Sequence, residues 1–260
     1  MGFLEIENIH HTYFSPKTAT TALENISLSI EEGEFVSFLG PSGCGKTTLL
    51  SIIAGLLEPT EGTIKIDGIH VNERKTLIGY MLQQDYLFPW KTIEENITLG
   101  LKIMNNDTEE NRRKALHLLK EMNLTNVEKL YPRELSGGMR QRVALVRTLS
   151  TNPKILLLDE PFSALDYQTK LKLEDLVFLT LKEYNKTALL VTHDIGEAIA
   201  MSDRIFLLKA NPGEIAKSFI VPNELKGLQP FSARQHPTFS ELFQQIWEEL
   251  NNLESTSTST

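Results

Sequence analysis

The sequence lacks features that mark several large classes of protein. Cys44 is the one cysteine among 260 residues, so no internal disulfide is expected and the composition suits a reducing compartment. No uncharged apolar run approaches the roughly 18 residues that span a bilayer, and the first residues lack the basic and apolar regions of a secretory signal. We therefore expect any role at a membrane to depend on a partner.

Positive charge is also scarce. The chain has 26 Lys and Arg residues against 34 Asp and Glu residues, which gives a formal net charge of -8. Binding to nucleic acid needs clustered Lys and Arg to neutralise phosphates, so we expect no nucleic-acid partner. A nucleotide remains compatible with an acidic chain, because a few backbone amides and one lysine are enough to bind it.

Short apolar segments alternate with segments of helical composition. The predicted strands lie at residues 3–9, 25–30, 35–39, 62–67, 77–82, 155–158, 188–192 and 205–208, and the predicted helices at 47–57, from Asp107 or Thr108 onward, at 136–149 and at 171–184. Continuous apolar strands alternating with helices predict an α/β domain whose mostly parallel sheet is covered on both faces. The mostly helical stretch at about 85–152 is then an insertion.

The segment after the strand at 35–39 has the pattern of a phosphate-binding loop. It matches G-x-x-x-x-G-K-[ST] and stands between an apolar strand and a helix, where such a loop belongs. The glycines let successive N–H groups face phosphate oxygens, Lys46 reaches the β- and γ-phosphates of ATP, and the Thr47 hydroxyl ligates Mg²⁺. The alternative is a glycine-rich turn that binds nothing, and Cys44 is either a reactive thiol or a small residue that fits the loop. The predicted nucleotide-binding residues are Gly40, Pro41, Ser42, Gly43, Cys44, Gly45, Lys46, Thr47 and Thr48.

Polar residues follow two later strands. Asp159 and Glu160 end the apolar run at 155–158, and His193 follows the strand at 188–192. In a parallel α/β fold ligands bind where strands end, so we expect these side chains at one sheet edge. Asp159 would hold Mg²⁺, Glu160 would orient or deprotonate the attacking water, and His193 would contact the γ-phosphate. The alternatives are a solvated acid pair and an ordinary surface or core histidine.

A second anion site is predicted at residues 135–142, which read Leu-Ser-Gly-Gly-Met-Arg-Gln-Arg. The start of a helix preceded by Ser136, Gly137 and Gly138 can bind an anion, but it lacks a lysine of its own. The run resembles the signature motif of ATP-binding cassette (ABC) ATPases. In that family two subunits face head to tail, and the signature of each closes over ATP held by the phosphate loop of the other. The resemblance therefore implies that Ser136, Gly137 and Gly138 bind the partner's ATP.

Further motifs of the family appear in order along the chain. Gln83 is similar to the glutamine that contacts Mg²⁺ and links the catalytic site to the membrane partner, with Gln84 as an alternative. Residues 163–166, Ser-Ala-Leu-Asp, resemble the D-loop, which assigns Asp166 to the nucleotide site. Tyr13 resembles the aromatic residue that stacks on adenine, although a core aromatic at a strand end is the competing interpretation. The catalytic residues that the resemblance and the motifs together predict are Glu160, His193, Lys46 and Gln83, and the metal ligands are Thr47, Gln83 and Asp159.

Four segments most resemble the importer subfamily for nitrate, sulfonate and taurine: residues 87–90, 139–142, 161–166 and 195–198. The subfamily often has Arg-Pro-Gly after the last core strand, where this chain has Asn-Pro-Gly at 211–213. The resemblance implies an ATPase that uses ATP and Mg²⁺ and pairs with a second copy of itself. It also implies two integral membrane permease subunits, an extracytoplasmic solute-binding protein reached through them, and a peripheral place on the cytoplasmic face of the membrane.

The resemblance also implies a domain organisation. We expect an ABC ATPase domain of the P-loop NTPase type at 3–230, with an antiparallel β subdomain at its N-terminal side and the helical insertion at about 85–152. A helical extension at 231–254 and a disordered tail at 255–260 would follow. The rival functions are a soluble ABC ATPase not coupled to transport, which usually has two cassettes or a long coiled-coil insertion, and an inactive regulatory cassette. The second rival conflicts with the presence of Lys46, Asp159, Glu160 and His193.

Overall fold

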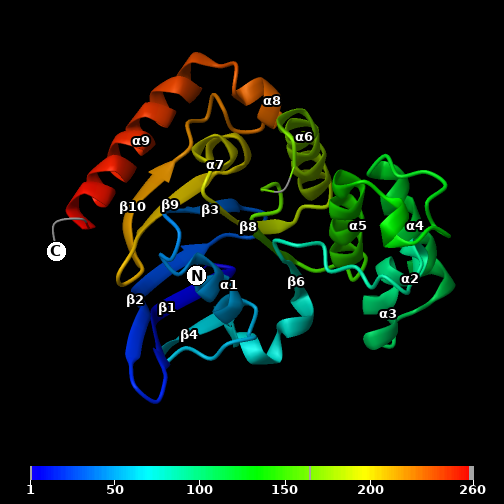
Figure 1. The fold of residues 1–260 in the computed structure, drawn as a ribbon, viewed down its shortest axis with the longest axis horizontal. Helices are drawn as coiled ribbons and strands as arrows, with labels where there is room; N and C mark the ends of the chain where they lie inside the picture. Colours follow the sequence, from blue (N-terminus) through cyan, green and yellow to red (C-terminus); the bar gives the residue numbers. More distant parts are fainter. Residues whose placement is uncertain (1, 164, 258–260) are drawn as a thin grey trace.

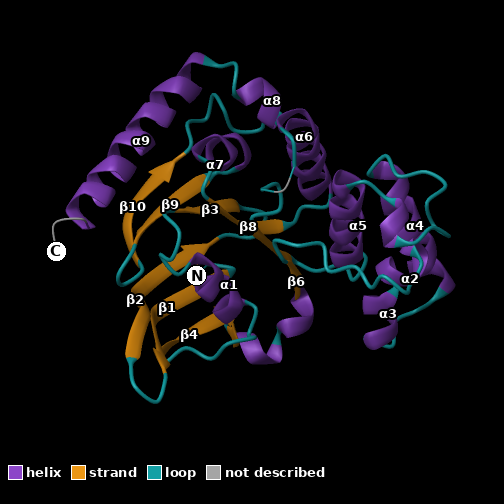
Figure 2. Ribbon diagram, viewed as in Figure 1, coloured by secondary structure: helices purple, strands orange, loops and turns teal. Residues whose placement is uncertain are grey.

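The structure is a computed structural model that describes residues 2–163 and 165–257. Its strands and helices form two sheets, a helical insertion and a C-terminal helical extension (Figures 1 and 2). The strands are β1 (Leu4–Phe14), β2 (Ala19–Ile30), β3 (Phe35–Leu39), β4 (Glu61–Ile66), β5 (Ile69–His70), β6 (Ile78–Met81), β7 (Ile155–Asp159), β8 (Thr187–Thr192), β9 (Arg204–Lys209) and β10 (Glu214–Ile220). The α-helices are α1 (Lys46–Ile53), α2 (Ile93–Ile97), α3 (Leu99–Ile103), α4 (Glu109–Glu121), α5 (Gly137–Leu149), α6 (Tyr167–Glu183), α7 (Ile195–Met201), α8 (Pro230–Ala233) and α9 (Pro237–Ser257).

The larger sheet has the strand order β10-β9-β3-β8-β7-β6. All neighbouring pairs are parallel except β10 and β9, which confirms the predicted mostly parallel sheet. Successive side chains of a strand point to opposite faces, so a strand buried on both sides supplies two cores. In β7, Leu156 and Leu158 pack with the helical insertion and α6, whereas Ile155 and Leu157 pack against α1 and the smaller sheet.

The smaller sheet is antiparallel, with the order β2-β1-β4-β5. Helix α1 lies between it and the larger sheet (Figure 1). Leu49, Leu50 and Ile53 of α1 are fully buried there. The helix that follows the phosphate loop is therefore fixed by apolar packing on two sides.

The helical insertion contains α2, α3, α4 and α5 and stands to one side of the sheets (Figure 1). Of the two candidate caps of α4, it is Thr108 that caps the helix: its hydroxyl accepts a hydrogen bond from the backbone N–H of Asn111. Asp107 instead pairs with Arg112. The buried Asn96 amide joins the loop before α2 to the helix: it donates to the Phe88 and Lys91 carbonyls and accepts from the Phe88 N–H. This network stabilises the chain where it enters the insertion.

The C-terminal extension packs on the face of the larger sheet opposite α1 and the smaller sheet. Phe239, Leu242 and Ile246 of α9 join a buried cluster with Ile195 and Ile199 of α7. Helix α9 continues through residues 255–257, the first half of the segment expected as a disordered tail, and 258–260 lie outside the described residues. Among the described residues, no helix has both the length and the apolar character needed to cross a bilayer.

A buried ion pair joins α6 to the end of α8. The Arg234 guanidinium lies 2.6 Å from Oε2 of Glu174, a side chain with no exposed surface. Burial raises the pKa of Glu174 to about 7, although the positive charge of Arg234 opposes this shift. Because the pKa of Glu174 is higher in the folded protein than in the unfolded chain, its protonated form stabilises the fold. This stabilisation is complete below the unfolded pKa of 4.5 and is lost as the pH rises to about 7.

Substitution Glu174→Gln removes this titration, so the stability of the variant should depend less on pH. Between pH 4.5 and pH 8, the free energy of unfolding of the unmodified protein should fall by about 3 kcal/mol more than that of the variant. Urea unfolding at several pH values measures both slopes. Glu248→Gln, on an exposed position of α9, is the control and should keep the original slope. Equal slopes for Glu174→Gln and the unmodified chain would contradict the assignment.

Candidate functional site

The parallel register of three strands gathers the predicted site residues at one sheet edge. Leu39, the last residue of β3, pairs with Thr192 at the end of β8, and Asp159 at the end of β7 pairs with Val191. The residues that follow each strand therefore emerge side by side: the loop from Gly40, then Glu160, then His193. This is the edge at which parallel α/β folds bind ligands.

The loop from Gly40 to Gly45 wraps tightly before α1, which begins at Lys46. Gly45 has φ 88° and is the N-cap of the helix, a backbone conformation that favours glycine. The buried Lys46 ammonium donates to the carbonyls of Gly40 and Pro41, at 2.7 and 2.9 Å, so the lysine lies within its own loop. Cys44 is buried, and burial raises the pKa of its thiol. This disfavours the thiolate and favours the interpretation of Cys44 as a packing residue.

Asp159 lies beside the first turn of α1. Its Oδ1 accepts a hydrogen bond from the Thr47 hydroxyl at 3.3 Å, and its Oδ2 accepts one from the Tyr80 hydroxyl at 3.4 Å. The carboxyl is only 5% exposed, and burial, with the nearby charge of Glu160, raises its pKa. Burial and the charge of Asp159 likewise raise the pKa of Tyr80 to about 12. The adjacent hydroxyl and carboxylate oxygens are of the type that Mg²⁺ prefers.

Glu160 is the meeting point of three segments. Nδ1 of His193 lies 3.3 Å from its Oε1, and the Gln83 side-chain amide donates to its Oε2 at 3.1 Å. The Glu160 backbone has φ 47°, an uncommon conformation for a residue with a side chain, and its N–H donates to the Val191 carbonyl. The structure thus brings Glu160, His193 and Gln83 together, and of the two candidate glutamines it is Gln83 whose amide reaches Glu160.

Tyr13 lies at the end of β1 close to α1. Its hydroxyl is 3.2 Å from the Thr48 hydroxyl, and its ring meets the ring of His11 edge to face at 4.6 Å. The side chain is 47% exposed, which argues against a core aromatic. An exposed ring face beside the phosphate loop is suited to stacking on a nucleotide base.

The signature residues lie away from this edge. Ser136 is the N-cap of α5, its hydroxyl accepting from the Met139 N–H at 3.4 Å, and both Ser136 and Gly137 are exposed. Within the described part of the chain, no hydrogen bond or ion pair joins residues 136–138 to the loop at 40–48. Figure 1 shows α5 in the insertion and α1 between the sheets.

Asp166 lies at the start of α6, where it caps the helix. Its side chain accepts from the Thr169 N–H at 3.1 Å, and hydrogen bonds from Thr169 lower its pKa. Ser163 of the same motif donates from its hydroxyl to the Glu160 carbonyl at 3.0 Å. Ala164, which belongs to the same motif, lies outside the described residues.

Several contacts that shape the site are not predicted by the sequence. The Gln141 side chain of α5 donates to the Gln83 carbonyl at 3.2 Å, and Arg140 pairs with Asp85 at 2.9 Å, so α5 holds the segment that carries Gln83. Tyr80 reaches Asp159 from the neighbouring strand β6. These contacts join residues 55 or more positions apart, and periodicity along one segment cannot reveal them.

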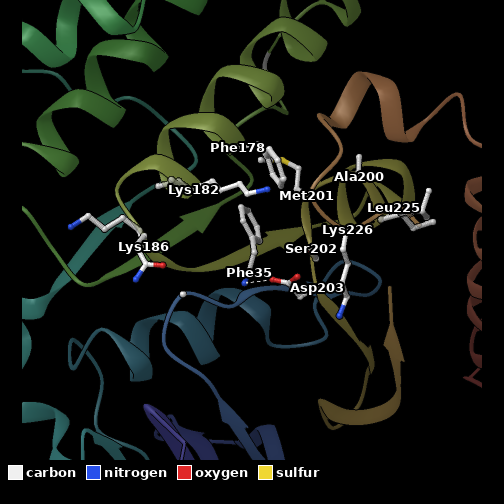
Figure 3. A pocket seen from close by; sticks show the side chains of 15 residues that line it. Phe35, Phe178, Lys182, Lys186, Ala200, Met201, Ser202, Asp203, Leu225 and Lys226 are labelled. Atoms are coloured by element: carbon white, nitrogen blue, oxygen red, sulfur yellow. Dashed lines mark hydrogen bonds between the residues drawn. The ribbon is translucent and has the colours of Figure 1, made fainter. Parts of the chain in front are cut away.

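Two cavities lie at opposite ends of the strands of the larger sheet. One of about 390 Å³ is bounded by Gly40, Pro41 and His193 on one side and by Phe243 and Trp247 of α9 on the other. Another, of about 180 Å³, lies at the opposite ends of the strands near Phe35 and Asp203 (Figure 3). In Figure 3 the side chain of Lys186 points away from the other lining residues, and this cavity is smaller than typical ligand pockets of roughly 300 Å³ or more.

The known proteins that this chain resembles are ABC ATP-binding proteins. The family described as ABC transporter matches residues 23–163, a range that includes the loop at 40–48 and both acids. An uncharacterized ABC transporter ATP-binding protein of Bacillus subtilis (strain 168), YtlC, is 65% identical over 254 residues, 98% of each chain. The aliphatic sulfonates import ATP-binding protein SsuB of a Bacillus cereus strain is 44% identical over 236 residues, 90% of this chain and 89% of that one. A dimeric structure of a post-hydrolysis state of the ATP-binding cassette MJ0796, bound to ADP and Pi, has a TM-score of 0.75 and 38% identity, covering 85% of this chain and 99% of that chain.

Substitution Gly45→Ala should disrupt the loop. A Cβ at this position would lie 2.5 Å from Cδ2 of Leu23 and 2.8 Å from the Ala22 carbonyl oxygen, so the loop must shift. We expect ATP affinity to fall at least about tenfold, since a loop displaced by a fraction of an ångström no longer aligns its amides with phosphates. Equilibrium titration with a fluorescent ATP analogue measures the affinity.

Gly68→Ala is the matched control for this variant. Gly68 also has a positive φ, 71°, but a Cβ there meets nothing within 4 Å. Both alanines carry a backbone strain of about 1 to 2 kcal/mol, and only the one at position 45 also clashes. An ATP affinity equally unaffected in both variants would contradict the importance of the close approach at Gly45.

Proposed function

The chain belongs to the ABC transporter family, whose cassettes hydrolyse ATP, and we propose that it is the ATPase subunit of an importer for a small solute of the nitrate, sulfonate and taurine class. One observation carries the catalytic part of this proposal. The phosphate loop, Asp159, Glu160 and His193 meet at a single edge of the parallel sheet, as ATP hydrolysis requires. The importer part is supported by SsuB, which is named for the import of aliphatic sulfonates.

Each of the site residues has a separate proposed role in phosphoryl transfer. The loop amides and Lys46 bind and neutralise the β- and γ-phosphates, and Tyr13 stacks on the base. Thr47, Asp159 and Gln83 would hold Mg²⁺, which would supply positive charge to the site. Glu160 orients the attacking water and accepts its proton, and His193 contacts the γ-phosphate from the next strand. The hydrogen bond from Gln83 and the contact with His193 keep the Glu160 carboxylate in place.

The exposed helix start at Ser136 implies a second copy of the chain. A serine and glycines at a helix N-terminus form an anion site, and here that site is remote from the chain's own loop. We propose that Ser136, Gly137 and Gly138, with Asp166, complete the ATP site of a partner copy. The dimeric MJ0796 structure, which is similar to this chain, supports this arrangement.

ATP binding would then close two copies together and hydrolysis would release them. This motion would drive two integral membrane permease subunits, which receive solute from an extracytoplasmic binding protein. The chain would lie peripherally on the cytoplasmic face of the membrane. The solute is chosen by the other subunits, because nothing in an ATP site distinguishes one transported solute from another.

Substitution Glu160→Gln should separate ATP binding from turnover. The amide keeps the shape and the hydrogen bond with Gln83 but cannot accept a proton, so turnover should fall by about 10²-fold or more while ATP affinity persists. The variant should elute as a dimer with ATP in size-exclusion chromatography. Glu224→Gln, on an exposed position, is the control and should keep full activity. Normal turnover in Glu160→Gln would assign the proton acceptor elsewhere.

The importer assignment has its own test. The chain is copurified with the permease subunits and binding protein of the same transport system, reconstituted in vesicles, and assayed for ATPase activity with nitrate, taurine and an aliphatic sulfonate in turn. One of these solutes should stimulate turnover severalfold above the basal rate. An ATPase that neither copurifies with permease subunits nor responds to any solute would be the soluble alternative, not coupled to transport.

A further inference from the structure

A cluster of charges lies beneath the loop that carries His193, with Lys170 and Glu197 largely buried and Asp194 partly exposed. The Lys170 ammonium of α6 contacts two carboxylates, Asp194 Oδ2 at 2.6 Å and Glu197 Oε1 at 2.5 Å. The Lys170 side chain is 14% exposed and that of Glu197 is 4% exposed. An ion pair at this depth is weakly screened by solvent, so removal of one partner leaves an unpaired buried charge.

The carboxylates of this cluster fix both neighbours of His193. Thr192 donates from its hydroxyl to Glu197 Oε2 at 2.5 Å, and the same hydroxyl accepts from the Asp194 N–H at 3.0 Å. Asp194 also caps α7 by accepting from the Glu197 N–H. The His193 side chain is itself 62% exposed, and its contact is with Glu160. The backbone of His193 is therefore held by the residues on either side of it.

Lys170 connects this loop to the other side of the catalytic edge. It lies in the first turn of α6, where its N–H donates to the carbonyl of Asp166, the residue that caps the helix. The segment before Asp166 begins at Glu160, whose carbonyl accepts from Ser163. Lys170 thus connects the segment that starts at Glu160 with the loop that contains His193.

The surroundings explain why a cation is needed at this position. Glu174 of α6 and Arg234 at the end of α8 adjoin the cluster, so three carboxylates share two cations. Without Lys170, the negative charges of Asp194 and Glu197 would face each other with Arg234 alone to oppose them, and Arg234 is already paired with Glu174. Repulsion would then move Asp194 and Glu197 apart, and His193 with them.

We propose that Lys170 is a positioning residue for ATP hydrolysis, holding the loop of His193 at the distance from Glu160 that turnover needs. The inference rests on the roles proposed above for Glu160 and His193. Lys170 touches neither of these side chains in the structure, so its effect should appear in turnover and not in the binding of ATP. A displacement of one catalytic group by about 1 Å is enough to lower a rate by one or two orders of magnitude.

The test compares Lys170→Met with Lys172→Met in the full-length chain. Lys172 is on the same helix but exposed, so the same substitution there leaves the cluster intact. For Lys170→Met we expect kcat to fall about tenfold with ATP affinity and KM within twofold of the unmodified values. Lys170→Arg should recover most of the rate, since a guanidinium also pairs with two carboxylates. A kcat equal to that of Lys172→Met, or a loss confined to ATP affinity, would overturn the proposal.

A double-mutant cycle with His193→Ala asks whether Lys170 acts through His193. We expect Lys170→Met to have little further effect on kcat once the imidazole is gone. A full tenfold loss in both backgrounds would show that Lys170 acts by another route. If His193→Ala alone turns over ATP at the normal rate, the role proposed for His193 is wrong. The comparison of Lys170→Met with Lys172→Met still measures the effect of Lys170 on kcat, because it does not depend on that role.

Glu197→Gln provides a second variant in case Lys170→Met does not fold. The amide keeps an oxygen for the Thr192 hydroxyl but removes one charge from Lys170. We expect kcat to fall about threefold with ATP affinity unchanged, a smaller effect because Asp194 still pairs with Lys170. An unchanged kcat in Glu197→Gln would also overturn the proposal.

Discussion

The parallel register of β3, β7 and β8 is the constraint on which the rest of the site depends. Because Leu39 pairs with Thr192 and Asp159 pairs with Val191, the segments after all three strands leave the sheet within one residue of each other. Parallel strands allow this convergence, since their C-terminal ends share an edge. The parallel packing of these continuous apolar strands, which are buried on both faces, is therefore also what aligns the phosphate loop with the two acids.

The same edge concentrates features that local rules disfavour. Asp159 is a carboxyl with a raised pKa inside the fold, Glu160 has a positive φ, and Lys170 pairs with the buried carboxylate of Glu197 and the partly exposed one of Asp194. Each costs stability in isolation, and each is tolerated because the surrounding strands and helices hold it in place. Their occurrence together at the ends of three strands is typical of a catalytic site and not of a structural core.

Local patterns in the sequence account for much of the fold and for the chemical groups of the site. The strand predicted at 35–39 coincides with β3, and the phosphate loop and the acid pair can be predicted because each motif is contiguous. Helix α7 was missed because all seven of its residues are buried, which removes the periodic pattern of a surface helix. Strand β10 was missed because it is an antiparallel edge strand with mostly partly buried or exposed residues. Contacts such as Lys170 with Asp194, 24 residues apart, depend on tertiary packing and leave no local pattern.

Gln83 shows how the helical insertion and the catalytic edge are connected physically. Its carbonyl accepts from Gln141 of α5, and its side chain donates to Glu160. Two residues further on, Asp85 pairs with Arg140, and its carbonyl accepts from Arg147 of the same helix. The helix whose exposed N-terminus would meet a partner's nucleotide therefore binds the segment that orients this chain's own Glu160. Any displacement of α5 relative to the sheets must either stretch these hydrogen bonds or move Gln83, so the two halves of the proposed ATP site are mechanically linked within each copy.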